Sequence, residues 1–308
     1  MNFGINLSFT VKRWVEPHVW AKIVRETLGL DLVQFTYDLL DPWWPDDVRR
    51  SMAAEVRKAS GDWGIQIESA FSGLANYCFD GLLHPDAAGR RASLEWWKRA
   101  FDVAAAVGAK ASGGPLGGMS VADATDPKRR DARYHGLLDS VAELSRAAKA
   151  SGLTRLQVEC TPLAREIPYT VEQAKKFLDD LDGRCEIPVM LLVDIGHALY
   201  QPLYGPNARM PEWLNGLGRS IGAFHLQNTD FQSDSHWGWP DKRGLFDVAG
   251  FAREVREAGL DDIPAFLEII YPFELADETV LASITSSVMH CRREYAGEKM
   301  EQKQIATQ

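Results

Sequence analysis

The sequence predicts a (β/α)₈ TIM barrel, an α/β fold in which eight parallel strands alternate with helices. Eight short apolar runs are each followed by a longer segment of helical periodicity, and no stretch rich in Gly, Pro and Ser separates two halves. An open doubly wound sheet would carry a glycine fingerprint after its first strand, whereas Ser8, Phe9 and Thr10 stand there. Eight such pairs close most simply into a barrel.

The elements follow one another in strict alternation along the chain. The predicted strands are 3–7, 32–35, 65–70, 109–112, 156–160, 189–194, 222–227 and 265–270. The predicted helices are 19–28, 46–63, 87–107, 131–151, 171–180, 210–217, 247–258 and 277–294. We therefore expect one barrel domain over residues 1–296, and a flexible C-terminal tail over 297–308, which has no apolar pattern.

A glycine-rich segment, GGPLGG at 113–118, follows the fourth predicted strand. It lacks the Gly-Lys-Ser/Thr ending of a phosphate-binding P-loop. We expect it to form a flexible loop over the barrel mouth.

Composition narrows the class of protein. Of the 308 residues 45% are hydrophobic and 25% charged, as in ordinary globular proteins, and the net charge of -9 comes from acidic residues scattered among basic ones. This balance argues against nucleic-acid and membrane partners. Four widely separated cysteines offer no CxxC pair. The start MNFGINLSF lacks the features of a signal peptide, so a cytoplasmic location is expected.

Polar residues close four consecutive predicted strands, at the end of a barrel where active sites are built. They occur in LQVECTP, VMLLVDIGH, AFHLQNTD and AFLEIIYPFE, and comprise Glu159, Asp194, His197, His225, Gln227 and Glu268. An unpaired carboxylate is costly to bury, so a positive group should lie between these strands. Three carboxylates and one carboxamide make an oxygen-rich site that favours Mn²⁺, with Mg²⁺ or Co²⁺ as alternatives. Pairing with Arg155 or Arg165, or helix capping, would also account for them.

The ordered segments VECTPLARE, VDIGHAL, FHLQNTD and FLEIIYPFE resemble the xylose-isomerase-like superfamily of sugar isomerases, epimerases and lyases, over nearly the whole chain. The resemblance implies that Glu159, Asp194, Gln227 and Glu268 bind the metal and that the two glutamates also move protons. Ketose 3-epimerases have His where Gln227 stands, whereas hydroxypyruvate isomerases have Gln. The ligand set alone therefore does not decide between epimerisation and isomerisation.

The chemistry agrees with these residue types. A metal bound by a ketose carbonyl and the neighbouring hydroxyl stabilises the enediolate that forms when the α-proton leaves. Glu159 and Glu268 are the predicted catalytic pair, one removing the proton and the other returning it to the opposite face. Which of them is the base stays open.

Further residues are expected to contact substrate. In DIGH, His197 has the spacing of a substrate-contacting histidine in the superfamily, although it could instead cap a helix or bond a buried carbonyl. Arg165 and Glu166 resemble the Arg-Glu pair that follows the first ligand in many relatives, where Glu166 would bond a substrate hydroxyl or be a solvated loop residue. His225 alternates with Gln227 along its strand and has either a substrate or a supporting role.

Two aromatic-rich segments, YDLLDPWWPDD and FQSDSHWGWPDKRG, follow the second and seventh strands. Their residues Trp43, Trp44, His236, Trp237 and Trp239 are expected to cover the barrel mouth and exclude water, or else to pack or form a dimer contact.

The second segment also contains Lys242 and Arg243, which could neutralise a substrate phosphate or simply be solvated.

Within the superfamily, DIGHALYQPLYG, HLQNTD, HWGWPD and EIIYPFE most resemble the tetrulose-phosphate epimerases of bacterial erythritol catabolism. This resemblance implies inversion at C3 of erythrulose phosphate and a homodimer or homotetramer. The alternatives are an aldose–ketose or hydroxypyruvate-type isomerase, a lyase of 3-keto-glycosides, and a sugar-binding barrel without catalysis. An apurinic endonuclease fits poorly, because the chain has seven His and a net charge of -9.

Overall fold

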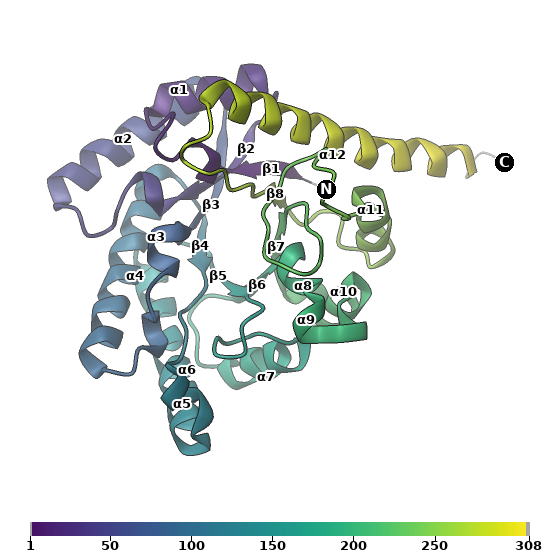
Figure 1. Ribbon diagram of the computed structural model, residues 1–308. Coiled ribbons are helices and arrows are strands. Elements are labelled where there is room, and N and C mark those ends of the chain that lie inside the picture. The colour runs from purple at the N-terminus through teal and green to yellow at the C-terminus, as the bar shows by residue number, and fades with distance from the viewer. Residues whose placement is uncertain (1, 306–308) are drawn as a thin grey trace.

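Eight parallel strands close into a barrel in the computed structural model, which describes residues 2–305 and the side chains of residues 2–295. The strands follow chain order, and β8 pairs with β1, for example Gly4 with Phe266. Helices surround the strands (Figure 1). The predicted fold class is confirmed.

The strands lie close to their predicted positions. They are β1 (Phe3–Asn6), β2 (Leu32–Thr36), β3 (Gln66–Phe71), β4 (Ala111–Gly114), β5 (Arg155–Cys160), β6 (Val189–Asp194), β7 (Ile221–Leu226) and β8 (Ala265–Leu267). β8 is shorter than expected, and Gln227 and Glu268 each follow the last residue of their strand.

All eight predicted helices are present, and four short ones add to them. The helices are α1 (Pro17–Lys22), α2 (Asp46–Asp62), α3 (Gly73–Tyr77), α4 (Ala87–Val107), α5 (Val121–Thr125), α6 (Pro127–Ala150), α7 (Val171–Leu181), α8 (Ile195–Ala198), α9 (Gln201–Tyr204), α10 (Met210–Leu217), α11 (Val248–Glu257) and α12 (Asp277–Ile305). A π-helical turn, η2 (Ile23–Thr27), continues α1 over the predicted first helix.

The C-terminal helix differs from the prediction. α12 continues to Ile305, past Glu294, and projects beyond the rest of the molecule in Figure 1. The predicted tail at 297–308 therefore continues the helix as far as Ile305, and residues 306–308 lie outside the described part. Among the described residues, no helix has both the length and the apolar character needed to cross a membrane.

The barrel interior has an apolar floor below a polar layer. Leu192, Ala223 and Phe266 belong to a small buried cluster that is separate from the main core between strands and helices. Two residues further along the same strands come Asp194, His225 and Glu268. Because side chains alternate along a strand, residues two apart face the same side. The polar layer therefore lies at the carboxyl end of the barrel, above the floor.

The glycine-rich segment is not the loop that the sequence led us to expect. Gly113 and Gly114 end β4, and the residues through Met119 are buried. A Cβ atom at Gly113 would lie 1.6 Å from the carbonyl oxygen of Gln157, so the two backbones approach too closely for any other residue. The backbone N–H of Met119 donates to the carbonyl oxygen of Arg165 at 2.8 Å. These contacts pack the segment against the neighbouring loop.

Candidate functional site

Three carboxylates meet at the carboxyl end of the barrel. Glu159 lies in β5, Asp194 ends β6 and Glu268 follows β8; their exposed fractions are 3%, 0% and 4%. One ligand atom from each of them and one from His225 lie within 4.8 Å of one another. Residues from four consecutive strands thus face one small space.

His225 occupies the middle of this group. Its Nδ1 lies 2.7 Å from Oε2 of Glu268, 3.4 Å from Oε1 of Glu159 and 3.9 Å from Oδ2 of Asp194. Burial disfavours the charged ring, but the carboxylates of Glu268 and Glu159 outweigh it and raise the pKa of His225 to about 10. Nδ1 of His225 thus faces all three carboxylates.

The two predicted catalytic glutamates have different electrostatic surroundings. Burial raises the pKa of Glu159, and His225 and His197 offset this effect only in part. Burial also disfavours ionised Glu268, but its pairing with His225 prevails and lowers the pKa below the ordinary value. The pKa values of the two carboxyl groups are therefore shifted in opposite directions.

Gln227 lies beside the carboxylates and presents its amide nitrogen, not its oxygen, to Asp194. Its Oε1 accepts a hydrogen bond from the backbone N–H of His236 at 2.5 Å, and its Nε2 donates to Oδ1 of Asp194 at 2.8 Å and to Oδ1 of Asp234 at 3.0 Å. An amide nitrogen that donates is not a metal ligand. Gln227 would have to rotate its amide to bind a metal through oxygen.

The donor set fits a divalent cation. Asp194 Oδ2 is buried without a hydrogen-bond partner, and Glu159 and Glu268 bring further oxygens to the same place. Arg155 pairs with Glu68, and Arg165 donates to the carbonyl oxygen of Met119 at 2.9 Å. The arginines that offered an alternative to a metal are therefore engaged elsewhere.

A second group of side chains adjoins the carboxylates. His197 lies in α8, where Oδ1 of Asp194 caps the helix by accepting from the N–H groups of Gly196 and His197. The side chain of Asp234 lies between two imidazoles, with Oδ2 3.2 Å from Nε2 of His197 and Oδ1 3.0 Å from Nε2 of His236. Asp234 raises the pKa of both rings against the effect of burial, that of His236 to about 10.

The next loop brings Glu166 close to this group. Glu166 is 6% exposed and accepts a hydrogen bond from Thr161 Oγ1 at 2.7 Å. Burial raises its pKa. Burial and the neighbouring charges of Glu166 and Glu159 raise the pKa of the hydroxyl group of Tyr77 in α3. Glu166 is thus a buried carboxyl group next to the site, not a solvated loop residue.

The predicted phosphate-binding residues belong to the loop after β7, where Arg243 pairs within the loop. Arg243 donates from Nη2 to Oδ2 of Asp241 at 2.7 Å, and its guanidinium carbon lies 4.0 Å from the ring centre of Trp237. Lys242 is exposed. Trp239 is only 4% exposed and stacks on His290, so it packs in the interior.

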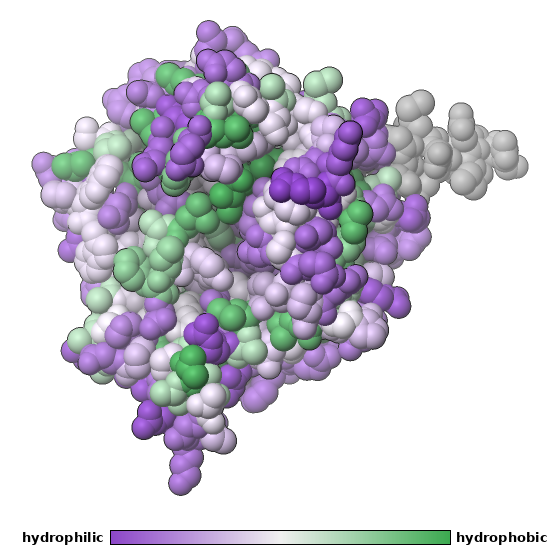
Figure 2. Space-filling view, in the orientation of Figure 1, coloured by the Kyte–Doolittle hydropathy of each residue, from purple (hydrophilic) through white to green (hydrophobic). Residues whose placement is uncertain are grey.

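The exposed apolar side chains near the mouth come from other loops. Leu74 and Phe79, at 38% and 68% exposed, follow β3, and Phe273, at 51%, follows β8. Figure 2 shows an apolar band that crosses the molecule from the region of α3 toward the loop before α12. Trp43 is 47% exposed and lies beside Arg99 of α4, among the outer helices.

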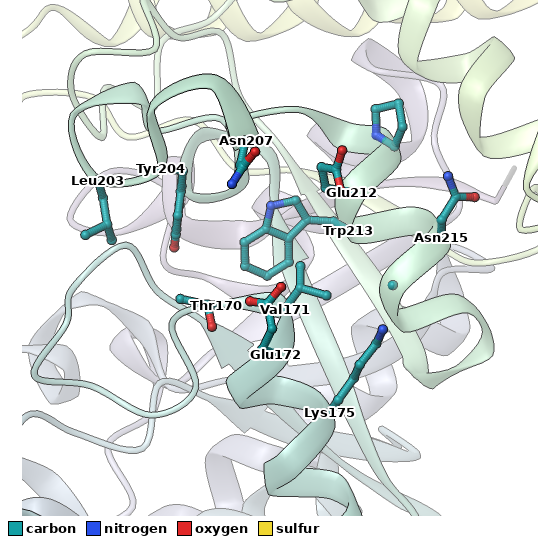
Figure 3. Close-up of a pocket in the computed structure, with 12 residues that line it drawn as sticks. Thr170, Val171, Glu172, Lys175, Leu203, Tyr204, Asn207, Glu212, Trp213 and Asn215 are labelled. Atoms are coloured by element: carbon teal, nitrogen blue, oxygen red, sulfur yellow. The ribbon is translucent and has the colours of Figure 1, made fainter.

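A separate hollow of about 500 Å³ lies between α7, α9 and α10 (Figure 3). Glu172 and Lys175 line it on one side and Asn207 and Glu212 on another. None of the predicted site residues lines it. Trp213, which also lines the hollow, donates from Nε1 to the carbonyl oxygen of Ala198 at 3.2 Å. This hydrogen bond supports α8, the helix that carries His197.

The sequence analysis missed three polar residues of this region, Asn6, Gln34 and Asp234. Asn6 Nδ2 donates to Oε1 of Glu268 at 3.1 Å, and Gln34 Oε1 lies 2.6 Å from Nε2 of His225. A signal for both exists in the sequence, because each is a polar residue in a mostly apolar strand, FGIN and LVQFT. Asp234 stands in an irregular loop and carries no such signal.

Comparison with known proteins agrees with this geometry. The family model described as "Xylose isomerase-like TIM barrel" matches residues 23–283. A candidate xylose isomerase from Rhodospirillum rubrum ATCC 11170 is 44% identical, with a TM-score of 0.93 over 95% of this chain and 99% of its own. The D-erythrulose 1-phosphate 3-epimerase of Brucella abortus (strain 2308) is 26% identical over 94% of both chains. An L-ribulose 3-epimerase, 18% identical, covers 98% of this chain and 97% of its own with a TM-score of 0.72 and shares the fold. The chain belongs to the xylose isomerase-like TIM barrel family.

Proposed function

We propose that the protein is a divalent-metal-dependent sugar phosphate epimerase that inverts C3 of erythrulose phosphate. The observation that carries the proposal is the buried cluster of Glu159, Asp194 and Glu268, in which Oδ2 of Asp194 has no hydrogen-bond partner. The name of the 26% identical relative, D-erythrulose 1-phosphate 3-epimerase, supports the substrate.

The metal would be held by Glu159, Asp194 and Glu268, with Gln227 as a fourth ligand after rotation of its amide. Mn²⁺ is the ion we favour, because the donors are hard oxygens. When bound, it would polarise the substrate carbonyl and the neighbouring hydroxyl.

The protein's own groups move the proton. One of the pair Glu159 and Glu268 accepts the proton from C3, and the C–H electron pair passes into the C2 carbonyl to give an enediolate. The other glutamate donates a proton to the opposite face of C3, which inverts it. His197 and Glu166 would hold the substrate hydroxyls, and the buried position of all these groups limits access of water.

Deuterium incorporation tests the proposal. Protein loaded with Mn²⁺ is incubated with erythrulose 1-phosphate and a panel of free ketoses in heavy water, and the products are followed by NMR. Deuterium at C3 with inverted configuration is the expected result. Deuterium at C1 of a free ketose, with an aldose product, would replace the epimerase by an isomerase, and no exchange in any ketose would overturn the proposal.

Two substitutions link the exchange to the site. Glu159→Gln and Glu268→Gln should each lower the exchange rate by at least about 100-fold, because each removes one partner of the proton transfer. Glu172→Gln is the matched control, since Glu172 is an exposed residue of the outer hollow. An unchanged rate in either site variant would exclude that glutamate.

A further inference from the structure

A chain of hydrogen-bonded, buried polar side chains lies next to His225 and Glu268. Asn6 of β1, Gln34 of β2 and Ser69 of β3 are between 0% and 1% exposed. Asn6 Nδ2 donates to Oε1 of Gln34 at 2.7 Å and to Oε1 of Glu268 at 3.1 Å. Gln34 Nε2 donates to Oγ of Ser69 at 3.2 Å. The chain thus joins three strands on one side of the barrel to the site.

One backbone group determines the direction of every hydrogen bond in this chain. The two ends of a carboxamide look alike, so its orientation follows from its partners. The backbone N–H of Ser8 donates to Oδ1 of Asn6 at 2.8 Å, which leaves Nδ2 of Asn6 to donate to Gln34. Gln34 must then accept at Oε1 and donate from Nε2 to Ser69.

The orientation of the Gln34 amide also determines which nitrogen of the His225 ring is a donor. Oε1 of Gln34 lies 2.6 Å from Nε2 of His225, and an oxygen can only accept. Nε2 of His225 therefore carries a proton, and Nδ1 is the nitrogen turned toward the carboxylates of Glu268 and Glu159. The partner of one ring nitrogen sets the orientation of the ring and the use of the other nitrogen.

We propose that Gln34 and Asn6 are positioning residues, which hold the His225 ring and the Glu268 carboxylate in one orientation for the reaction. Glu268 is approached at both oxygens: Asn6 donates to Oε1, and Nδ1 of His225 lies 2.7 Å from Oε2. Without the acceptor on Gln34, the ring can turn, and the contact between Nδ1 and Glu268 is lost. The kinetic consequence rests on the proposed epimerase; the orientation of the ring does not.

NMR of metal-free protein with ¹⁵N-labelled histidine tests the orientation directly. In the unmodified protein the signals of His225, identified by their loss in His225→Gln, should show a protected proton on Nε2. Gln34→Met keeps the length of the side chain and removes the acceptor, so the Nε2 proton should shift and exchange faster with solvent. Gln34→Glu restores an acceptor oxygen and should restore protection. A proton found only on Nδ1, or His225 signals that are unchanged in Gln34→Met, would overturn the proposal.

Kinetics with the Mn²⁺-loaded protein provides the second measurement. Gln34→Met should lower kcat for proton exchange at C3 by roughly 10–100-fold with KM nearly unchanged, and Gln34→Glu should recover part of the loss. Gln157→Met is the matched control, because Gln157 is another buried amide, two residues before Glu159, and is not among the hydrogen-bond partners of Gln34 in the described part of the chain. Equal losses in the two Met variants would show a general packing effect and overturn the positioning role.

The two hypotheses fail in different ways. If no ketose exchanges but the Nε2 proton responds to Gln34 as described, the epimerase is wrong and the proposed ring orientation stands. If exchange occurs but the ring does not respond to Gln34, the epimerase stands and the positioning role is wrong. Should Gln34→Met not fold, Asn6→Ser removes the upstream donor, and it should likewise expose the Nε2 proton and lower kcat.

Discussion

Oδ1 of Asp234 lies 3.0 Å from Nε2 of His236, although the two side chains differ in exposure, 39% against 10%. The backbone of His236 has a φ of 45°, in the left-handed region that a non-glycine residue seldom adopts. This conformation turns the imidazole inward, where Nδ1 lies 3.2 Å from the carbonyl oxygen of Glu268. A surface loop thus brings a carboxylate and an imidazole to the edge of the carboxylate cluster.

Replacing this carboxylate should impair the reaction without unfolding the protein. We expect Asp234→Asn to lower kcat/KM by about 10–100-fold, since a carboxylate that orients an imidazole at a metal site typically has an effect of that size. The measurement is steady-state exchange at C3 together with thermal unfolding. Asp241→Asn, in the same loop but paired with Arg243, is the control, and the two variants are compared with free erythrulose, which has no phosphate to bind Arg243. Similar losses in both variants would point to a disturbed loop rather than to the two histidines.

Metal binding should stabilise the protein. Three buried carboxylates repel one another, and a bound divalent cation offsets this repulsion, so a chelator should lower the Tm and added Mn²⁺ should raise it. A concentration of 100 times the Kd gives about 2.7 kcal/mol of stabilisation, which amounts to several degrees in a barrel of this size. Differential scanning calorimetry and metal analysis check this result.

Asp194→Ala should abolish the shift in Tm with Mn²⁺. The exposed Asp262→Ala provides the comparison, because its carboxylate pairs with Arg219 far from the cluster. Retention of one ion per chain by the Asp194 variant would contradict the ligand set.

The regular parts of this fold follow closely from sequence patterns. β6 has its predicted bounds because the apolar run VMLLVD ends in a charged residue. α4 also has its predicted bounds, because Asp86 caps its first turn and Gly108, with a φ of 95°, ends it. The sequence also predicted that Glu159, Asp194 and Glu268 would lie close together, because the carboxyl ends of the strands converge in a parallel barrel.

The missed parts depend on tertiary contacts that no local pattern encodes. The orientation of the Gln227 amide is determined by a backbone N–H nine residues later, and that of Asp234 by the turn at His236. Gly113 was misread as part of a loop because its need for glycine arises from the backbone of Gln157, on the neighbouring strand. Irregular loops lack the periodicity that makes strands and helices recognisable.

The loop that carries Glu268 is held by the first loop of the barrel, and breaking that link should reduce stability. Arg13 donates from Nη2 to the carbonyl oxygens of Pro272 at 2.7 Å and Leu275 at 3.0 Å, and its side chain is only 4% exposed. We expect Arg13→Ala to lower the free energy of unfolding by about 2–3 kcal/mol, because the loop loses a buried, charged donor that bonds two of its carbonyl oxygens.

Urea unfolding measures this change, with Arg25→Ala as the control. Arg25 pairs with Asp31 at 3.8 Å and is 47% exposed, so its loss should cost less than about 1 kcal/mol. Equal effects of the two substitutions would show that Arg13 does not link the loops.

The ion pair between Arg243 and Asp241 should affect how the protein binds a substrate phosphate. A phosphate group that binds here must draw the guanidinium away from Asp241 or add to its remaining donors. Arg243→Ala should therefore raise KM for erythrulose phosphate by about tenfold, the effect of losing roughly 1.4 kcal/mol of binding, and leave free erythrulose unaffected. Lys242→Ala should act in the same direction.

Asp241→Asn sharpens the test, because it removes the competing carboxylate while leaving Arg243 in place. If Arg243 binds phosphate, this variant should lower KM for the phosphorylated ketose alone, because the phosphate no longer has to displace the Asp241 carboxylate from Arg243. Steady-state kinetics on both ketoses gives the comparison. Parallel changes of KM for the two substrates would remove Arg243 from phosphate recognition and leave its contact with Trp237 as packing in the loop after β7.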